Sequence, residues 1–230
     1  MSHLPRGIFK VLAVFAFVSL TFLTVLPSFQ VQAAPTALWN TFGAKKKISK
    51  KGVPQVQGVD AYMTTPDTPT GWGEITAAPV GVSNWDILPF AESGPYKKCE
   101  FQCGYHVYWS YMDVQGIWET VFLDDINLLP NGWYEYRTSY LGNNMWRIEF
   151  CDGNGCIVLQ DVNLKTNRVK YAAAGGEGID TNFGPVTSAA FKWRNVKGVW
   201  ANACYTDVLR TVDGQITPCG GNFDWTVQFP

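Results

Sequence analysis

Histidine is almost absent from this chain, which has two in 230 residues. His3 lies near the N-terminus, so His106 is the single histidine of the remaining chain. Zinc sites that use several histidines are therefore excluded there, and a Ser-His-Asp triad would have to use this one residue. The other interpretation of His106 is a polar strand residue in a cleft or at the surface.

Several common functional motifs are also missing. The sequence has no P-loop, no GxGxxG after a strand and no GxSxG nucleophile elbow, so phosphate and dinucleotide chemistry can be set aside. It has no CxxC pair, which argues against zinc and leaves no metal or cofactor to propose. Helical spacing is nearly absent, and no repeat of fixed period indicates a propeller or solenoid.

Long apolar runs are absent except at the N-terminus. Arg6 and Lys10 precede the run Val11–Leu26, and Val31-Gln32-Ala33 resembles a cleavage signal. This layout predicts a signal peptide over residues 1–33 and a protein that is secreted, with no membrane contact after cleavage. The alternative is a transmembrane anchor, because the run is nearly as long as the ~17–25 residues that span a bilayer.

The charge of the exported part is low. Removing residues 1–33 takes away two basic residues and no acidic residue, so the formal net charge moves from −1 to −3, which argues against nucleic acid as a partner. Residues 34–57 contain AKKKISKKG and are expected to form a basic tail or a short pro-segment that lies against an acidic catalytic face. We expect residues 58–230 to form one domain.

An even number of cysteines lies in the exported part, which predicts three disulfides. These are Cys99, Cys103, Cys151, Cys156, Cys204 and Cys219.

Local spacing favours some pairings of these cysteines. Cys151 and Cys156 flank a turn-forming Asp-Gly-Asn-Gly, within disulfide reach, and Cys204 with Cys219 is a plausible clamp on a C-terminal loop. Cys99 and Cys103 would lie ~13 Å apart in a straight strand, too far to bridge. Either the chain bends there or these two cysteines pair elsewhere.

Short alternating runs broken by Gly, Pro, Asn and Asp follow one another from Gly58 onward. The clearest unit, Trp133–Gln160, predicts a three-stranded meander with turns at Gly142–Asn144 and Asp152–Gly155. Further strands are expected at Gly58–Met63, Phe101–Tyr111, Val114–Phe122, Arg168–Ala173, Ala189–Trp193 and Phe223–Phe229. Many short strands of this kind are typical of an antiparallel sandwich or barrel.

The run CEFQCGYHVYWSYMD has two different faces. Alternation places Phe101, Cys103, Tyr105, Val107 and Trp109 on an apolar, core-facing side. The opposite side carries Gln102, Gly104, His106, Tyr108 and Ser110. This second face is either solvent-exposed or the floor of a site.

Carboxylates are the remaining candidates for chemistry. A glycosidase would need two of them about 5–9.5 Å apart, and Glu119 and Glu135 could pair in this way across strands. Glu177 is more unusual because five small residues precede it in AAAGGEG. Small residues let another backbone approach closely, as a protease cleft requires, although a flexible loop with one exposed acid fits the same residues.

These segments resemble a known family. RVKYAAAGGEGI, residues 168–179, resembles the A-x-x-V-x-W-G-G-E-V segment of the neprosin family of secreted peptidases, with Ala174 in place of the tryptophan. FQCGY resembles that family's I-E-A-G-W segment, in which the glutamate is catalytic. Gln102 stands there instead, as in the L-Q-T-G-I segment of the related fungal glutamic peptidases (eqolisins). Both families place a longer connection before the next aromatic run than separates FQCGY from YWSYM.

The resemblance implies an all-β fold, an antiparallel β-sandwich of the concanavalin-like jelly-roll type, here stapled by disulfides. It also implies a metal-independent endopeptidase that acts on polypeptides at acidic pH. Glu177 would activate water, and the Gln102 amide would donate a hydrogen bond to the oxyanion. The substrate would contact residues beside this dyad, for which we expect Gly104, His106, Trp109 and Tyr111.

A non-catalytic sandwich that binds carbohydrate or a cell-wall polymer is the alternative function. Ten tryptophans and ten tyrosines are present, and large aromatic faces suit sugar rings. Core filling explains the same aromatic content.

Overall fold

The computed structural model describes residues 39–50, 53–66, 75–84, 89–99, 103–179, 185–210 and 214–228. The predicted signal peptide, residues 1–33, lies outside these ranges and stays a prediction. Within the described ranges, no helix is long and apolar enough to cross a membrane, and no group of three or more metal-binding side chains forms. All described elements belong to the compact unit Ala37–Pro230.

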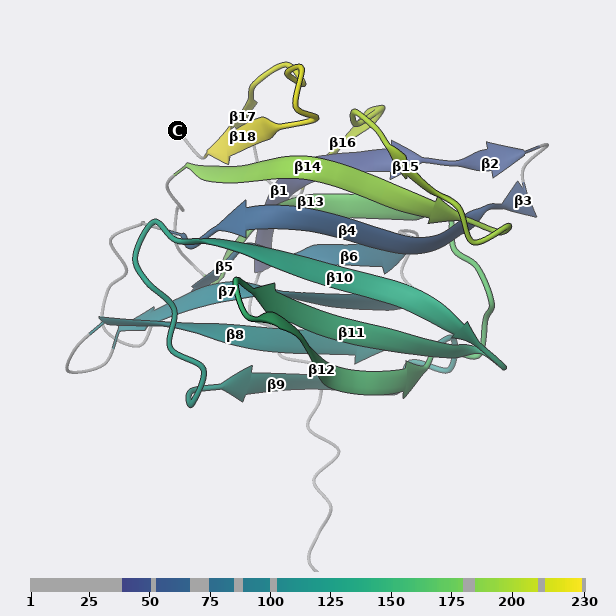
Figure 1. Cartoon of the computed structure of the whole chain (residues 1–230), viewed down its shortest axis with the longest axis horizontal. Coiled ribbons are helices and arrows are strands. Elements are labelled where there is room, and N and C mark those ends of the chain that lie inside the picture. Colours follow the sequence, from purple (N-terminus) through teal and green to yellow (C-terminus); the bar gives the residue numbers. More distant parts are fainter. Residues whose placement is uncertain are drawn as a thin grey trace, which may run out of the picture. The chain divides into compact units, whose positions relative to one another are not determined.

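Two antiparallel sheets face each other in this unit (Figure 1). The first sheet has the order β16 (Asp207–Arg210), β1 (Trp39–Lys47), β13 (Tyr171–Ile179), β5 (Ile75–Ala77), β7 (Phe90–Cys99), β8 (Cys103–Met112), β9 (Trp118–Leu123), and β6 (Val80–Ser83) also pairs with β13 and β7. The second has the order β12 (Gly155–Asn163), β11 (Met145–Asp152), β10 (Trp133–Gly142), β4 (Val56–Thr64), β14 (Val186–Asn195), β18 (Trp225–Gln228), β17 (Gln215–Ile216), with β15 (Trp200–Asn202) beside β14. A short ribbon joins β2 (Ser49–Lys50) and β3 (Val53–Pro54).

The core lies between the two sheets and is built by alternation along each strand. The largest fully buried side chains include Trp146, Tyr136 and Phe191 from the second sheet, and inward residues of β7 and β8 meet them from the first. The expected β10–β11–β12 meander is confirmed. Its first turn places Asn143 and Asn144 at positive φ, which asparagine tolerates and a tight hairpin needs.

All three disulfides form, with the pairs Cys99–Cys103, Cys151–Cys156 and Cys204–Cys219. The alternative left open for Cys99 is thereby settled, because the chain bends instead of running straight. β7 ends at Cys99 and β8 begins at Cys103, and the two cysteines face each other across this hairpin. The expected disulfide-stapled antiparallel sandwich is therefore confirmed.

The segment expected to be a basic tail contributes to the first sheet. β1 lies between β13 and β16, so Trp39–Lys47 is part of the sheet and not a tail. Lys45 is buried, its Nζ lies 3.5 Å from the Asp207 carboxylate and 4.7 Å from the ring centre of Tyr171. A stretch of lysines can occupy a strand because alternate side chains point to different sides. Removal of residues 34–57 in the mature protein stays a prediction.

A truncation series tests the place of β1. We expect a chain that begins at Ala37 to unfold cooperatively like the full chain, whereas one that begins at Gly58 loses β1 and leaves one edge of β13 unpaired. The second chain should aggregate or become protease-sensitive, as measured by thermal circular dichroism and limited proteolysis. If it unfolds cooperatively at the same temperature, residues 37–57 are dispensable and the tail interpretation returns.

Candidate functional site

Glu177 lies on the outer face of the first sheet. In β13, Ala172 and Ala174 point into the core, so alternation directs Ala173, Gly175 and Glu177 to the other side. Directly across the strands from Glu177 comes a row formed by Ala77, Tyr96 and His106. Glu177 therefore projects from a strand of small residues, and not from the flexible loop that the same residues also allowed.

A second carboxyl group, that of Glu92 on β7, shares this outer face. Its neighbour Ala91 is fully buried in the core, and Glu92 stands opposite Gly81 on one side and Ser110 on the other. A Cβ on Gly81 would lie 2.6 Å from the Glu92 Cβ, so only glycine leaves room for Glu92 at this register. Glu92 therefore depends on Gly81 for its position.

A row that contains three glycines lies between the row of Glu177 and the row of Glu92. We call Gly43, Gly175 and Gly94 the glycine row; Gly43 faces Gly175, and Gly94 faces Tyr108 on β8. A Cβ would lie 2.8 Å from the Gly175 Cα if placed on Gly43, and 2.2 Å from the Ala78 carbonyl oxygen if placed on Gly94. A side chain is thus excluded at Gly43 and at Gly94, which keeps the sheet surface low at these two positions.

Tyr108 connects this row to Glu92. Its hydroxyl donates to Glu92 Oε1 at 3.4 Å, and the ring is 3% exposed. Burial, together with the charges of Glu92 and Glu177, raises the pKa of Tyr108 well above its ordinary value. The phenol therefore keeps its proton and remains a hydrogen-bond donor.

The pKa of Glu92 is raised well above the ordinary value. Burial is the main cause and the nearby Glu177 carboxylate adds to it, while the hydrogen bond from Tyr108 acts in the opposite direction. Two carboxyl groups that interact in this way do not both ionise at weakly acidic pH. Glu92 is thus the group that retains a proton when an ordinary glutamate has lost it.

Aromatic rings lie at the β9 side of the same face. The ring centre of Phe122 is 4.9 Å from that of Tyr96 and 6.2 Å from that of Tyr108, and Tyr96 is 5.5 Å from His106. Tyr96 is fully buried and donates a hydrogen bond to Asp124, whereas Phe122 is 38% exposed. Phe122 faces Tyr108 across β8 and β9, so it continues the glycine row at one end.

The sequence matches no protein-family model and no curated protein. Two structures of scytalido-glutamic peptidase, solved with transition-state analogues, match with TM-scores of 0.58 and 0.60 at 11% and 12% identity. SCP-B, a member of the Eqolisin family solved with the tripeptide Ala-Ile-His, matches with a TM-score of 0.52 at 11% identity. Each match covers 85% of this chain and 100% of the other.

The fold is that of the glutamic peptidases. At these identities the likeness establishes the eqolisin-like architecture, and the site has to be argued from this chain's own residues.

Two of the predicted substrate-contacting residues lie on the outer face and two do not. His106 shares the row of Glu177, and Gly104 lies two residues before it on β8, where an added Cβ would lie 2.2 Å from His106 Nε2, so the imidazole would have to move. Trp109 is 5% exposed inside the core, and Tyr111 packs against the core with its ring stacked on Trp109. The alternation of β8 directs this pair away from Glu92 and Glu177, so neither lines the outer face.

Gln102, the expected partner of Glu177, lies outside the described residues and stays a prediction. The structure instead brings Glu92 near Glu177, and Glu92 was missed in the sequence. A signal for it was present: Ala91-Glu92-Ser93-Gly94 has the Glu-x-Gly spacing of the I-E-A-G-W segment. The connection from Glu92 to the aromatic run of β8 is also longer than the one from Gln102 to that run, because the β7–β8 hairpin lies between Glu92 and β8.

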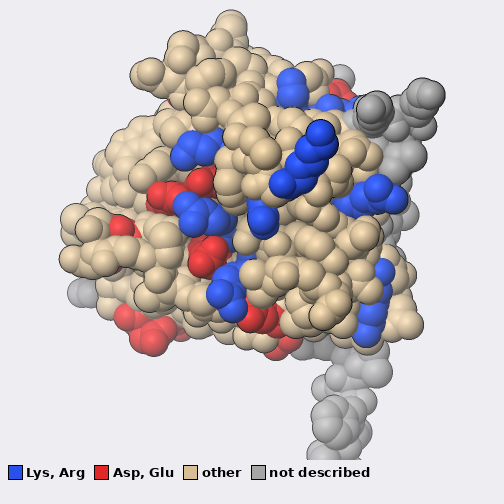
Figure 2. All heavy atoms as spheres, turned by 45° about the vertical axis from the view of Figure 1, so that its right-hand side comes forward, with Lys and Arg blue, Asp and Glu red and all other residues tan. Residues whose placement is uncertain are grey.

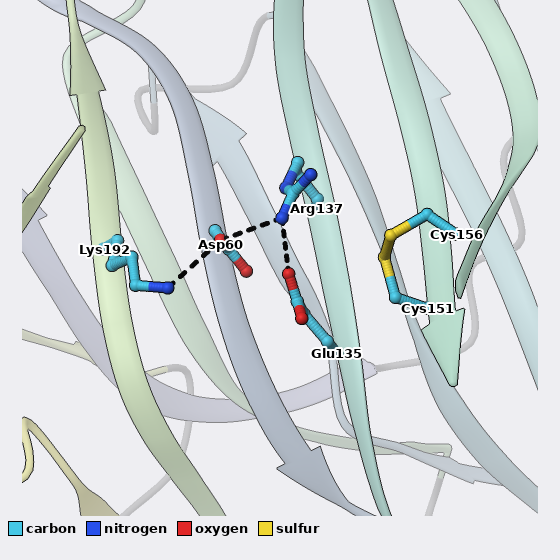
Figure 3. A network of polar contacts seen from close by, with 6 residues as sticks. All are labelled: Asp60, Glu135, Arg137, Cys151, Cys156 and Lys192. Carbon is cyan, nitrogen blue, oxygen red and sulfur yellow. Dashed lines mark hydrogen bonds and ion pairs between the residues drawn. A yellow bond between two sulfur atoms is a disulfide. The ribbon is translucent and has the colours of Figure 1, made fainter. Parts of the chain in front are cut away.

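A separate polar network occupies the outer face of the second sheet (Figure 3). Asp60 on β4 lies between Arg137 on β10 and Lys192 on β14, with nitrogen–oxygen distances of 3.3 and 3.6 Å, and Arg137 also pairs with Glu135. Glu119 lies on β9 of the first sheet and Glu135 on β10 of the second, so the two do not pair across neighbouring strands as a glycosidase pair would. Figure 2 shows acidic and basic side chains close together on the face that it presents.

Asp60 and Glu135 interact strongly within this network. Burial and the nearby Glu135 raise the pKa of Asp60 to about 6. Burial also acts to raise the pKa of Glu135, but hydrogen bonds with Asp60 and Tyr62 outweigh it and hold that pKa below its ordinary value. The two carboxyl groups thus share one proton under a pair of cations, which is a structural arrangement across three strands.

Replacing Asp60 tests this shared proton. Because its pKa is raised from 3.8 to about 6, the stabilisation from Asp60 is complete at low pH and is lost as the pH rises through about 6. The free energy of unfolding of the native protein, relative to Asp60→Asn, should therefore fall from about pH 4 to about pH 6 and level off above that in urea titrations. Asp161→Asn is the control, since Asp161 has a lowered pKa and its difference should stay flat over this range. A flat Asp60→Asn difference would contradict the shared proton.

Proposed function

We propose that this chain is a secreted glutamic-type endopeptidase that hydrolyses peptide bonds at acidic pH without a metal, using Glu177 and Glu92. The observation that carries the proposal is the placement of these two interacting carboxyl groups on either side of the glycine row, on a fold shared with glutamic peptidases. The three disulfides fit an oxidising, extracellular location.

In the first step, the ionised Glu177 accepts a proton from a water molecule, whose oxygen attacks the carbonyl carbon of the scissile bond. Glu92, which keeps its proton because it is buried beside another carboxylate, donates a hydrogen bond to the carbonyl oxygen as negative charge develops there. The absence of side chains in the glycine row leaves room for the substrate backbone between the two groups.

In the second step, the tetrahedral intermediate collapses. The carbon–nitrogen bond breaks, the carbonyl double bond re-forms, and the protonated Glu177 passes its proton to the leaving nitrogen. The products are a new carboxyl terminus and a new amine, and Glu177 is ionised again. Tyr108, through its hydrogen bond, holds the Glu92 carboxyl in place during both steps.

Replacement of the two carboxyl groups tests the dyad. Glu177→Gln and Glu92→Ala should lower kcat/KM for a denatured protein at acidic pH by about 10²–10⁴, the contribution of a general base or an oxyanion donor. Glu119→Gln, at an exposed site on β9, is the matched control and should stay active. If Gln102→Ala abolishes cleavage and Glu92→Ala does not, the oxyanion donor is Gln102 and not Glu92.

The conservative variant Glu92→Gln separates the two kinds of donor. Glu92 can donate only while it is protonated, so activity of the native enzyme should fall as the pH rises through its raised pKa. A glutamine amide donates without titrating, so Glu92→Gln should retain more activity than Glu92→Ala and should extend activity to higher pH. The measurement is kcat/KM against pH for all three proteins. An unchanged alkaline limb in Glu92→Gln would show that another group sets it.

One observation keeps the carbohydrate-binding alternative open. Tyr62 and Trp133 are 39% and 49% exposed, and register places both on the outer face of the second sheet beside Glu135. Retention of the protein on insoluble polysaccharide, lost in Tyr62→Ala and Trp133→Ala, combined with no cleavage of any protein, would favour this function over the peptidase.

A further inference from the structure

Phe122 closes one end of the glycine row with an apolar ring. Starting from Gly43 and Gly175, the row passes Pro79, whose carbonyl oxygen accepts a hydrogen bond from the Gly175 N–H, and then Gly94. It ends at Tyr108 on β8 and Phe122 on β9. Its two ends therefore differ, because one end consists of glycines and the other carries aromatic rings that meet edge to face or at a tilt. A peptide that lies along this row meets a bulky apolar surface on one side only.

We propose that Phe122, Tyr96, Tyr108 and His106 form a subsite for a large apolar side chain, aromatic or branched, beside the scissile bond of the peptide substrate. This inference rests on the proposed function and names the class of peptide that the site selects.

The first argument is position. Tyr108 donates to the Glu92 carboxyl and also contacts Phe122, so a single ring separates Phe122 from the proposed oxyanion donor. β9 lies two strand spacings from β7, or ~10 Å. One extended residue covers ~3.5 Å, and its side chain spans much of the remainder. The residue next to the scissile carbonyl is therefore the one that can reach Phe122.

The second argument is rigidity. Tyr96 is fully buried, meets Phe122 edge to face, and is fixed by its hydrogen bond to Asp124. Tyr108 is fixed by its hydrogen bond to Glu92. Phe122, by contrast, leaves 38% of its surface exposed over this fixed base. A preorganised apolar surface of this kind binds an apolar group with little ordering cost.

The third argument is charge. Three carboxyl groups, those of Glu92, Glu177 and Asp124, lie on the same side of the sheet as the rings or hydrogen-bond to them. An acidic side chain placed there would be repelled, whereas an apolar one is not affected. The subsite thus favours large apolar residues over both small and acidic ones.

Cleavage of matched peptides tests the subsite. Internally quenched peptides carry Phe, Leu or Ala on each side of the scissile bond in turn, with the remaining sequence unchanged. We expect kcat/KM for Phe or Leu to exceed that for Ala by about 10- to 100-fold at one of the two positions. Phe122→Ala should reduce this ratio to less than about 3-fold, and Phe122→Tyr should restore it.

Leu141→Ala is the control variant, because Leu141 is 48% exposed on β10 of the second sheet. The ratio of kcat/KM for the Phe peptide to that for the Ala peptide should be the same in this variant as in the native enzyme. Equal cleavage of all peptides by the native enzyme, or an unchanged ratio in Phe122→Ala, would overturn the subsite.

Binding to Glu177→Gln protein separates the subsite from the catalytic proposal. The Kd of the Phe peptide should be at least about 10-fold lower than that of the Ala peptide, and adding Phe122→Ala should remove the difference. If this preference is present but the native protein cleaves nothing, the peptidase proposal fails and the subsite stands as a peptide-binding site. If the two peptides bind equally, the subsite is wrong whatever the catalytic result.

Discussion

Close approach of backbone to backbone across the first sheet is the constraint on which the site depends. Gly43 meets Gly175, Gly81 meets the Cβ of Glu92, and Gly94 meets the Ala78 carbonyl, each at a distance that excludes a side chain. Glycine normally weakens a strand because it offers nothing to pack and loses more entropy on folding. Here that cost keeps the sheet surface low at Gly43 and Gly94, and Gly81 leaves the room that Glu92 needs.

Carboxyl pairs occur on both outer faces of the sandwich, and their partners give them different roles. Asp60 and Glu135 share a proton under Arg137 and Lys192, so their charge is compensated and they join three strands. Glu92 is instead held by the Tyr108 phenol, which donates a hydrogen bond without supplying a positive charge. Burial beside Glu177 then acts directly on its protonation. The structural pair thus has cationic partners, whereas the candidate catalytic pair has a neutral hydrogen-bond donor.

Local patterns predicted much of the fold because local chemistry determines those parts. Alternation gave the Trp133–Gln160 meander, and the Asp-Gly-Asn-Gly turn gave the Cys151–Cys156 bridge. The lysine-rich β1 was missed because its place depends on pairing with β13, more than 120 residues away in sequence. Trp109 was expected to contact the substrate although its alternation places it in the core. Glu92 was missed because its meeting with Glu177 depends on the order of strands, which periodicity does not reveal.

The identity of the oxyanion donor links burial to the pH range of the reaction. A glutamine amide would donate at any ordinary pH, and its surroundings would not need to control its protonation. A glutamate donates only as the neutral acid, so a solvated, ordinary glutamate would have lost its proton at weakly acidic pH. The burial of Glu92 and its proximity to Glu177 both favour the neutral form of its carboxyl group in the folded state. Two carboxyl groups on one sheet face repel each other when both are ionised. This repulsion, together with burial, is what keeps Glu92 protonated.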